Sequence, residues 1–320
     1  MTTDLTTAGE MMALRAHTRG GPEQLTYERA PRPRAAAGEI VVAVGAAAIT
    51  FAELSWPETW EADGVDRTPT IPSHEFAGVV AEVGEGVTGL SIGDSVFGLV
   101  PFNRDGAAAE YVAVPVSDIT KKDASVSDLT AAAAVLPALT AWEALRDHAP
   151  LATGQRLLVR GGIGAVGSFL TQFAHELGIE VTVTITSAAG EERARALGAS
   201  HIVVTDRNAT EWPDLSGFDA AIDAVGAVPE WMYAAVRPGG QLLGLQEEPN
   251  AELAAKYGMN AMFFVVATDP DRLQDLARLL ASGTLDVPVA QTFPLAEGRA
   301  AYESRAHPNP VPGKTVILIR

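Results

Sequence analysis

Residues Leu157-Leu158-Val159-Arg160-Gly161-Gly162-Ile163-Gly164-Ala165-Val166-Gly167 join a short apolar run to a glycine-rich turn. The glycines at 162, 164 and 167 have the spacing of a loop whose backbone approaches a dinucleotide pyrophosphate closely. Apolar residues then recur at helical spacing, at Val166, Phe169, Leu170, Phe173 and Leu177. A strand, this loop and a helix whose N-terminus faces the phosphates predict nucleotide binding, with a merely structural turn as the alternative. The loop residues expected to hold the phosphates are Gly162, Gly164, Ala165, Val166 and Gly167.

Strand and helix patterns alternate along the chain from Arg156 onward. The candidate strands are residues 157–159, 181–186, 201–204, 220–222, 241–245 and 263–266. Alternating strands and helices indicate a parallel, doubly wound sheet with helices on both faces. Six such strands are the number needed for a complete dinucleotide-binding fold.

The rest of the chain has a different pattern. The first 125 residues contain short apolar runs separated by glycine turns, which predicts a small β-barrel or sandwich. We expect a helix that Ser127 or Asp128 can cap and that runs through residues 131–136, an interruption at Pro137 and a second helical piece at 139–148. The tail should form a helix at 273–281 and strands at 287–293 and 315–319 that rejoin the first domain. The expected domains are therefore residues 1–125, 126–268 and a C-terminal segment, 269–320.

Composition narrows the possible functions of the 320 residues. The net charge of -17 disfavours nucleic acids and anionic membranes as partners, because both would be repelled. The chain contains no cysteine, which excludes disulfides, thiolate nucleophiles and cysteine-based metal sites. No apolar run approaches the roughly 20 residues of a membrane span, and residues 1–10 do not resemble a signal peptide. We expect a cytoplasmic protein.

Several stretches match one family, in that family's order. The chain resembles the medium-chain dehydrogenase/reductase superfamily, and within it the zinc-independent quinone oxidoreductase branch. The resemblance implies an α/β fold with a GroES-like β-barrel domain, a Rossmann domain containing a doubly wound parallel sheet, and an active-site cleft between them. Besides the glycine loop, the matching stretches are residues 71–80, 93–98, 109–112, 136–145, 223–226 and 313–316.

The resemblance also bears on metal binding. Zinc-dependent alcohol dehydrogenases of this superfamily have a cysteine about where Thr50 stands and a His-Glu pair where His74-Glu75 stand. The four-cysteine structural lobe is missing as well. We expect no metal site, although Glu53, His74 and Glu75 could supply ligands in principle. The alternative role for His74 is that of a hydrogen-bonded imidazole in the cleft.

The residues after the second strand of the alternating region bear on cofactor choice. An enzyme that prefers NAD usually has a carboxylate about 20 residues beyond the glycine loop, and here the chain reads Thr184-Ile185-Thr186-Ser187-Ala188. Thr186 and Ser187 can donate hydrogen bonds to a 2′-phosphate, and Arg193 can pair with it, so NADPH is favoured. Alternatively, Arg193 is a surface charge paired with Glu191 and Glu192. Arg195 is a weaker candidate for the partner of the 2′-phosphate.

Further cofactor contacts are implied by the resemblance alone. Val225-Gly226 would pass beside the ribose, and Gly244-Leu245 would lie near the nicotinamide. Phe264-Val265, in the sixth strand, would offer backbone groups to the carboxamide. That strand tends to pair with its copy in a second subunit, so a homodimer is expected.

Without zinc a carbonyl group lacks its Lewis acid, whereas quinones and α,β-unsaturated ketones delocalise an incoming charge themselves. We therefore expect hydride transfer from NADPH to a quinone or to the β-carbon of an enone. Thr50 could hold the nicotinamide or the substrate carbonyl, with Glu53 or His74 as proton relay. Trp56 and Trp60 could form an aromatic wall for the substrate, or could simply be packing residues.

Two other functions stay open. A biosynthetic enoyl-thioester reductase would be expected to carry a tyrosine within residues 49–60, which this chain lacks. A non-catalytic NADPH-binding protein would bind the cofactor and reduce nothing.

Overall fold

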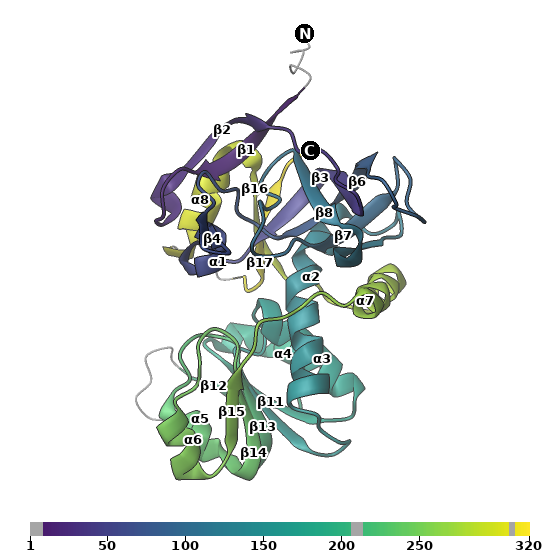
Figure 1. Cartoon of the computed structure of the whole chain (residues 1–320). Helices are drawn as coiled ribbons and strands as arrows, with labels where there is room; N and C mark the ends of the chain where they lie inside the picture. The colour runs from purple at the N-terminus through teal and green to yellow at the C-terminus, as the bar shows by residue number, and fades with distance from the viewer. Residues whose placement is uncertain (1–8, 206–213, 307–310) are drawn as a thin grey trace. The chain divides into compact units, whose positions relative to one another are not determined.

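The computed structural model describes residues 9–205, 214–306 and 311–320. They form two compact units, drawn in Figure 1. The β-rich unit comprises the residues up to Leu136 together with 268–284 and 289–320, and the parallel-sheet unit comprises 137–267 with 285–288. None of the described helices has the length and apolar composition required to cross a membrane.

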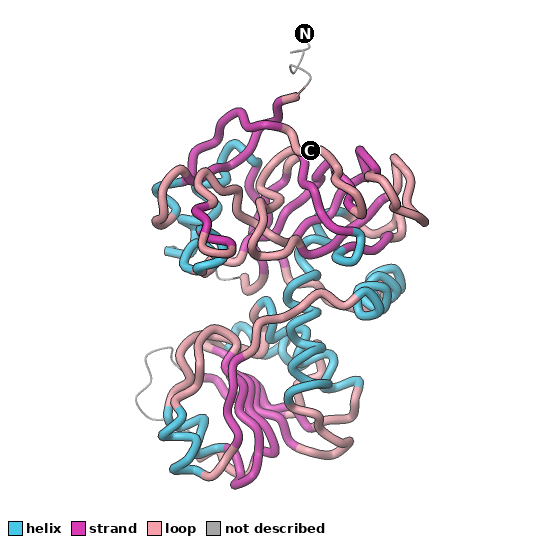
Figure 2. The backbone as a smooth tube through the Cα atoms, viewed as in Figure 1, coloured by secondary structure: helices cyan, strands magenta, loops and turns pink. Residues whose placement is uncertain are grey.

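The parallel-sheet unit is built on six strands that run in the same direction, side by side in Figure 2. Their order is β12-β11-β10-β13-β14-β15. Central strands of such a sheet are covered on both faces, and Leu157, Leu158 and Val159 of β10 are fully buried. The prediction of a doubly wound sheet is confirmed. The strands are β10 (Arg156–Arg160), β11 (Glu180–Ile185), β12 (His201–Val204), β13 (Phe218–Asp223), β14 (Val236–Gly244) and β15 (Asn260–Phe263).

Helices lie on both sides of this sheet. Figure 1 shows α3 on one side and α5 and α6 on the other. Phe169 and Leu170 of α3 are fully buried, as the helical spacing predicts, but Leu177 is 39% exposed. The helix ends at Glu176, so Leu177 becomes its C-cap and leaves the buried face. The helices are α3 (Ala165–Glu176), α4 (Glu191–Ala196), α5 (Glu230–Ala235) and α6 (Ala251–Tyr257).

Two expected boundaries are wrong. Helix α2 (Asp128–Glu143) continues through Pro137 and is followed by a π-helical turn at Ala144–His148. Its residues 131–135 are fully buried, and this packing outweighs the hydrogen bond that Pro137 cannot donate. Strand β15 ends at Phe263, which pairs with Gly244, the last residue of the neighbouring strand β14. Phe264 and Val265 therefore follow the sixth strand and do not belong to it.

The β-rich unit is organised around a seven-stranded sheet. Its order is β16-β17-β3-β6-β7-β9, and β8 also pairs with β3. Strand β17 pairs with β3 and β16 pairs with β17, so the last two strands of the chain belong to this sheet. The strands of the unit are β1 (Glu10–Ala16), β2 (Leu25–Pro31), β3 (Glu39–Ile49), β4 (Glu61–Ala62), β5 (Val65–Asp66), β6 (Glu75–Val83), β7 (Ser95–Leu99), β8 (Tyr111–Pro115), β9 (Ile119–Lys121), β16 (Val289–Pro294) and β17 (Lys314–Leu318).

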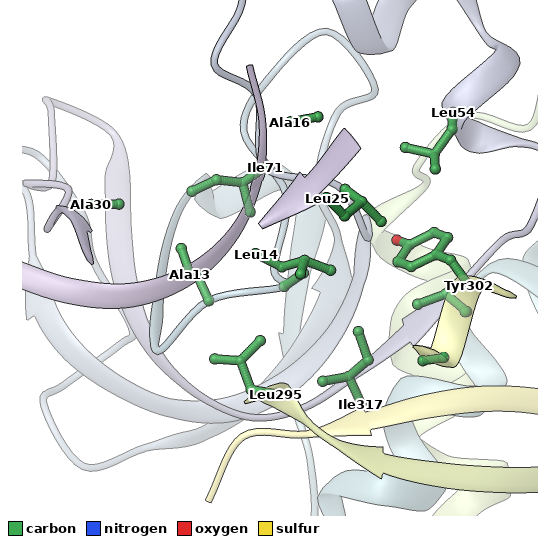
Figure 3. Packing of buried hydrophobic residues seen from close by; sticks show 14 of the residues in the cluster. Ala13, Leu14, Ala16, Leu25, Ala30, Leu54, Ile71, Leu295, Tyr302 and Ile317 are labelled. Atoms are coloured by element: carbon green, nitrogen blue, oxygen red, sulfur yellow. The ribbon is translucent and has the colours of Figure 1, made fainter. Parts of the chain in front are cut away.

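Its helices are short except for α7. They are α1 (Pro57–Trp60), α7 (Pro270–Ser282) and α8 (Gly298–Glu303), with 3₁₀ turns at Pro22–Gln24, Glu53–Ser55, Val116–Asp118, Leu295–Glu297 and Ser304–Ala306. Figure 3 shows Tyr302 of α8 and Ile317 of β17 in one apolar cluster with Ala13 and Leu14 of β1. The C-terminal segment is therefore part of the core of this unit.

Strands β3 and β6 approach each other closely at Gly78. A Cβ atom at this position would collide with the backbone carbonyl of Ala43 on β3. We predict that Gly78→Ala lowers the stability of the β-rich unit by about 1–3 kcal/mol, because two paired strands must move apart. The measurement is the thermal unfolding midpoint. Val79→Ala on the same strand is the control: Val79 is 39% exposed, so its truncation should cost less, and equal losses for the two variants would contradict the packing argument.

Candidate functional site

The glycine loop folds tightly between β10 and α3. Gly161 has a φ of 81°, which favours glycine. A Cβ on Gly162 would collide with Val183 of β11, and one on Gly167 would collide with the carbonyl of Gly161. These two glycines therefore let the first turn of α3 pack directly on the strand ends.

The N-terminus of α3 is open. Gly164 is its N-cap and no side chain caps it, so backbone N–H groups of the first turn remain for a ligand. A Cβ on Gly164 would meet only the Gly161 carbonyl, at 3.3 Å. An uncapped helix N-terminus suits an anionic phosphate. The loop fits the pyrophosphate of a dinucleotide.

Parallel strands bring the other predicted cofactor residues to the same edge of the sheet. Thr186-Ser187, Val225-Gly226, Gly244-Leu245 and Phe264-Val265 follow or end strands β11, β13, β14 and β15. The strand order reverses between β10 and β13, which is where open parallel sheets bind their ligands.

An ion pair at this reversal point was not identified from the sequence. Arg160 Nη1 lies 2.7 Å from Asp223 Oδ2 and donates to the carbonyl of Ala227 at 3.1 Å. Asp223 is fully buried, and its Oδ1 accepts from the Val225 N–H at 2.8 Å. Burial raises the pKa of Asp223, and the Arg160 guanidinium opposes that rise. The pair links the glycine loop to the loop after β13.

The residues that directly follow β11 are Thr186-Ser187-Ala188 and include no carboxylate. Thr186 is exposed, and the Ser187 hydroxyl accepts a hydrogen bond from Ala189 N at 3.3 Å. Arg193 Nη2 lies 2.8 Å from Asp286 Oδ1, not against Glu191 or Glu192. Arg195 is the residue that pairs with Glu191, at 2.5 Å.

A buried polar cluster lies in the β-rich unit, and its members come from distant parts of the chain. Glu53, in a 3₁₀ turn, is 1% exposed. The Tyr302 hydroxyl of α8 donates to Glu53 Oε1 at 2.5 Å, and Ser73 N donates to Oε2 at 2.8 Å. Burial raises the pKa of Glu53 to about 7, although both hydrogen bonds favour the charged form. The members of the cluster are Thr50, Glu53, Ser73, His74, Glu75, Tyr302 and Lys314.

Lys314 places an ammonium group beside Thr50. Its Nζ donates to Thr50 Oγ1 at 3.0 Å and to Glu75 Oε1. Thr50 Oγ1 in turn donates to Glu75 Oε1 at 3.2 Å. Burial raises the pKa of Glu75, and Lys314 opposes the rise. Thr50 is the half-buried member of a cluster that is otherwise buried.

His74 is held as a neutral imidazole. Burial, reinforced by the nearby Arg67 guanidinium, lowers the pKa of His74 to about 3. Its Nε2 lies 3.8 Å from Glu53 Oε2, which is too long for a hydrogen bond. The ring packs edge-on against Phe102, with 5.2 Å between centroids.

The two tryptophans differ in their surroundings. Trp56 is half-buried and packs edge-on against Phe102 at 5.1 Å. Trp60 is 4% exposed, and its indole N–H donates to the carbonyl of Leu54 at 2.9 Å. The burial of Trp60 is that of a packing residue, which was the alternative to a substrate wall. Trp56, Phe102 and His74 form a row of aromatic rings.

The residues at the family's zinc positions do not fit a zinc ion. Glu75 is held by the Lys314 ammonium and Thr50 offers a hydroxyl that is already hydrogen-bonded. Within residues 9–205, 214–306 and 311–320, no three His, Cys, Asp or Glu side chains are arranged to hold a metal. Zinc prefers thiolate and imidazole ligands in tetrahedral geometry, and this cluster lacks both the thiolate and the geometry.

Two family models match the sequence. Residues 36–124 match the alcohol dehydrogenase GroES-like domain, and residues 197–317 match the zinc-binding dehydrogenase family.

Curated relatives of this chain include oxidoreductases and polyketide synthases. A probable mitochondrial zinc-binding oxidoreductase of Arthroderma benhamiae is 27% identical over 90% of this chain and 91% of its own length. A 2-methylene-furan-3-one reductase of Solanum lycopersicum is 32% identical over 76% of this chain, and the match spans 64% of that protein. A mycocerosic acid synthase-like polyketide synthase of Mycobacterium tuberculosis is 28% identical over 91% of this chain, which spans only 14% of that protein.

Solved structures share the whole fold. The quinone oxidoreductase from Coxiella burnetii is 25% identical, with a TM-score of 0.85, over 97% of this chain and 100% of that one. A cobalt- and zinc-bound thermostable alcohol dehydrogenase from Pyrobaculum aerophilum is 27% identical, with a TM-score of 0.81 and the same coverage.

The raised pKa of Glu53 predicts a pH-dependent stability. Between pH 4.5, the ordinary pKa of the group, and about 7, the folded chain keeps a proton that the unfolded chain releases, so stability falls as pH rises. Glu53→Gln removes this titration. Between about pH 4 and about pH 8, the free energy of unfolding of the wild type should therefore fall by about 3 kcal/mol relative to that of the variant. Urea unfolding at a series of pH values measures both.

Wild type must be compared with the variant because the titration of His74 changes the stability of both proteins with pH, in the opposite direction to Glu53. Its lowered pKa makes stability rise as pH rises from about 3 toward 6.5 in both proteins. A stability difference between wild type and Glu53→Gln that does not change with pH would show that Glu53 has an ordinary pKa.

Proposed function

This chain belongs to the medium-chain dehydrogenase/reductase superfamily, in its quinone oxidoreductase-like branch, and we propose that it uses NADPH, without a metal, to reduce a quinone or an α,β-unsaturated carbonyl compound. The observation that supports the proposal is the cluster around Thr50, where a hydroxyl stands at the position of the cysteine and the Lys314 ammonium lies 3.0 Å from it. Such a site offers hydrogen bonds and a fixed charge to a substrate that needs no strong Lewis acid.

The parallel-sheet unit is the proposed cofactor-binding part. NADPH, when bound, supplies the hydride that reduces the acceptor. The uncapped N-terminus of α3 holds the pyrophosphate, and the loops after β13, β14 and β15 hold the nicotinamide half. The ion pair between Arg160 and Asp223 fixes two of these loops relative to one another.

The choice of NADPH depends on Arg193. Its ion pair with Asp286 joins side chains that are 30% and 48% exposed, so the pair contributes little stability. A 2′-phosphate offers a stronger, charge-assisted partner to the same guanidinium, and the absence of a carboxylate at Thr186-Ser187 leaves space for it. When the cofactor binds, Arg193 would therefore exchange its partner Asp286 for the 2′-phosphate, which requires only a small rearrangement.

Thr50 is the proposed contact to the substrate oxygen. The hydroxyl donates to Glu75, and Glu75 also accepts from Lys314, so Thr50 can turn its proton toward a substrate while Glu75 stays paired. The Lys314 ammonium, 3.0 Å from Thr50 Oγ1, stabilises negative charge that develops on that substrate oxygen.

Glu53 is better suited than His74 to relay the proton. The pKa of Glu53, about 7, lies near neutral pH, so the carboxyl can both hold and release a proton there. The pKa of His74 is about 3, and this ring stays neutral. Trp56 and Phe102 offer a flat apolar wall for a conjugated substrate.

Two relatives favour particular substrate classes. The name of the tomato enzyme specifies a methylene group conjugated with a ketone, which is an enone. The polyketide synthase relative supports a second candidate, reduction of an enoyl thioester, although this chain spans only 14% of that protein. A homodimer is proposed through β15, which is a terminal strand of its sheet and pairs with β14.

A panel of acceptors tests the reaction. We expect NADPH oxidation, followed at 340 nm, with a quinone or a conjugated alkenal, and little with saturated ketones, which need more polarisation than this site supplies. Gly164→Val, whose side chain would enter the phosphate path, should remove the activity while the protein stays folded; Ile163→Val is the matched control. Turnover of crotonyl-CoA alone would favour the second candidate, and cofactor binding without turnover of any acceptor would favour a non-catalytic protein.

Cofactor choice has its own test. We predict that Arg193→Met raises the Kd for NADPH by ~10-fold or more and leaves the Kd for NADH nearly unchanged, because one charge-assisted pair to the 2′-phosphate is lost. Fluorescence titration measures both constants. Arg195→Met, on the same helix and paired with Glu191, is the control and should change neither. Equal affinity for the two cofactors in wild type would overturn the preference.

A further inference from the structure

A cavity of about 520 Å³ opens in the β-rich unit. It lies among β1, the end of β2 and the segment after it, β8, and residues 104–106. No member of the buried polar cluster around Thr50 lines it. The cavity is therefore separate from the site proposed for substrate reduction.

Three arginines line this cavity, namely Arg15, Arg34 and Arg104. Each contacts one carboxylate through Nη1: Arg15 contacts Glu28 at 3.1 Å, Arg34 contacts Glu82 at 3.3 Å, and Arg104 contacts Glu39 at 2.6 Å. A guanidinium group carries five N–H donors in a planar fork, so each arginine keeps donors for a further anion.

The acidic residues of the cavity are already engaged. Glu28 and Glu82 do not line it, whereas Glu39 and Asp105 do. Glu39 is held by Arg104, which lowers the pKa of this carboxyl. Asp105 accepts from Ile71 N at 3.1 Å and lies 3.9 Å from Arg67. The lining thus carries three guanidinium groups and two carboxylates, of which Asp105 is the exposed one, with 60% of its side chain exposed.

Tyr111 lines the cavity, and two further guanidinium groups lie near its ring. The guanidinium of Arg32 lies 3.8 Å from the ring centroid, and that of Arg320 lies 5.1 Å from it. Within the described part of the chain, Arg32 has no carboxylate partner, and its buried Nε has no hydrogen-bond partner. Five arginines therefore gather here, in a chain with 23 basic and 40 acidic residues.

The remaining lining is apolar. Met11, Ala30, Ile71 and Val112 are each buried to at least 96%, and Pro31 and Pro33 extend the same surface. Small-molecule sites combine an apolar surface with a few polar groups that fix orientation. We propose that this cavity binds a small amphipathic organic anion, whose carboxylate or phosphate pairs with Arg34 and Arg104 while its apolar body lies against Tyr111 and Ile71.

The proposal is tested by calorimetric titration of the full chain with benzoate, with phenyl phosphate and with neutral benzyl alcohol. NADPH is present at saturation, so that binding in the cofactor loop is excluded. We expect saturable binding of at least one of the two anions and at least ~10-fold weaker binding of benzyl alcohol, because a charge-assisted pair is missing. The tighter of the two anions identifies the preferred group. Binding of neither anion would overturn the proposal.

Single substitutions locate the binding. Arg34→Met should weaken anion binding by ~10-fold or more without affecting folding, because the Arg34 side chain is 74% exposed. Arg104→Met should also weaken anion binding by ~10-fold or more. The thermal unfolding midpoint of this variant shows whether the loss of the partner of Glu39 has disturbed the β-rich unit. Arg29→Met is the matched control: Arg29 lies on β2 in an exposed pair with Glu10 and does not line the cavity. Equal affinity in Arg34→Met and Arg29→Met would place the anion elsewhere.

Discussion

The contact of Gly167 with the carbonyl of Gly161 determines where α3 begins, and the cofactor site depends on that contact. Because neither glycine has a side chain, the helix starts directly against the end of β10. The helix N-terminus therefore lies at the edge of the sheet where the strand order reverses between β10 and β13. The parallel strands bring four further loops to the same edge. The chain has a net charge of -17, so an anionic cofactor must be held by this local arrangement and not by the overall field.

A second constraint is the burial of charged groups in the β-rich unit. An isolated buried carboxylate is strongly unfavourable, so Glu75 requires Lys314, and Glu53 requires the hydrogen bonds from Tyr302 and Ser73. The same interactions give the cluster its chemistry. Lys314 places a fixed positive charge beside Thr50, and burial, opposed by the hydrogen bonds from Tyr302 and Ser73, raises the pKa of Glu53 to about 7. A conjugated acceptor can use this environment, whereas a zinc ion lacks the ligands it prefers.

The features that the sequence predicted are those with a local signal. The glycine spacing located the loop, and the alternation of strands and helices predicted the six-stranded sheet, because both patterns depend on near neighbours. Tyr302 and Lys314 could not be found in this way: they reach Glu53 and Glu75 across 249 and 239 residues. Pro137 was misjudged because the burial of residues 131–135 is a tertiary effect that local propensity does not contain. The ends of β14 and β15 likewise depend on pairing, which moved Phe264 and Val265 out of the sixth strand.

The proposed mechanism is that a nicotinamide cofactor, whose pyrophosphate lies at the glycine loop, gives its hydride to a conjugated acceptor without a metal. Transfer of deuterium from NADPH labelled at C4 to an enone such as a 2-methylene-furan-3-one tests it most directly, with the product analysed by NMR. We expect deuterium on the carbon β to the carbonyl, in protein treated with a chelator. Deuterium on the carbonyl carbon, or transfer that requires added zinc, would contradict it.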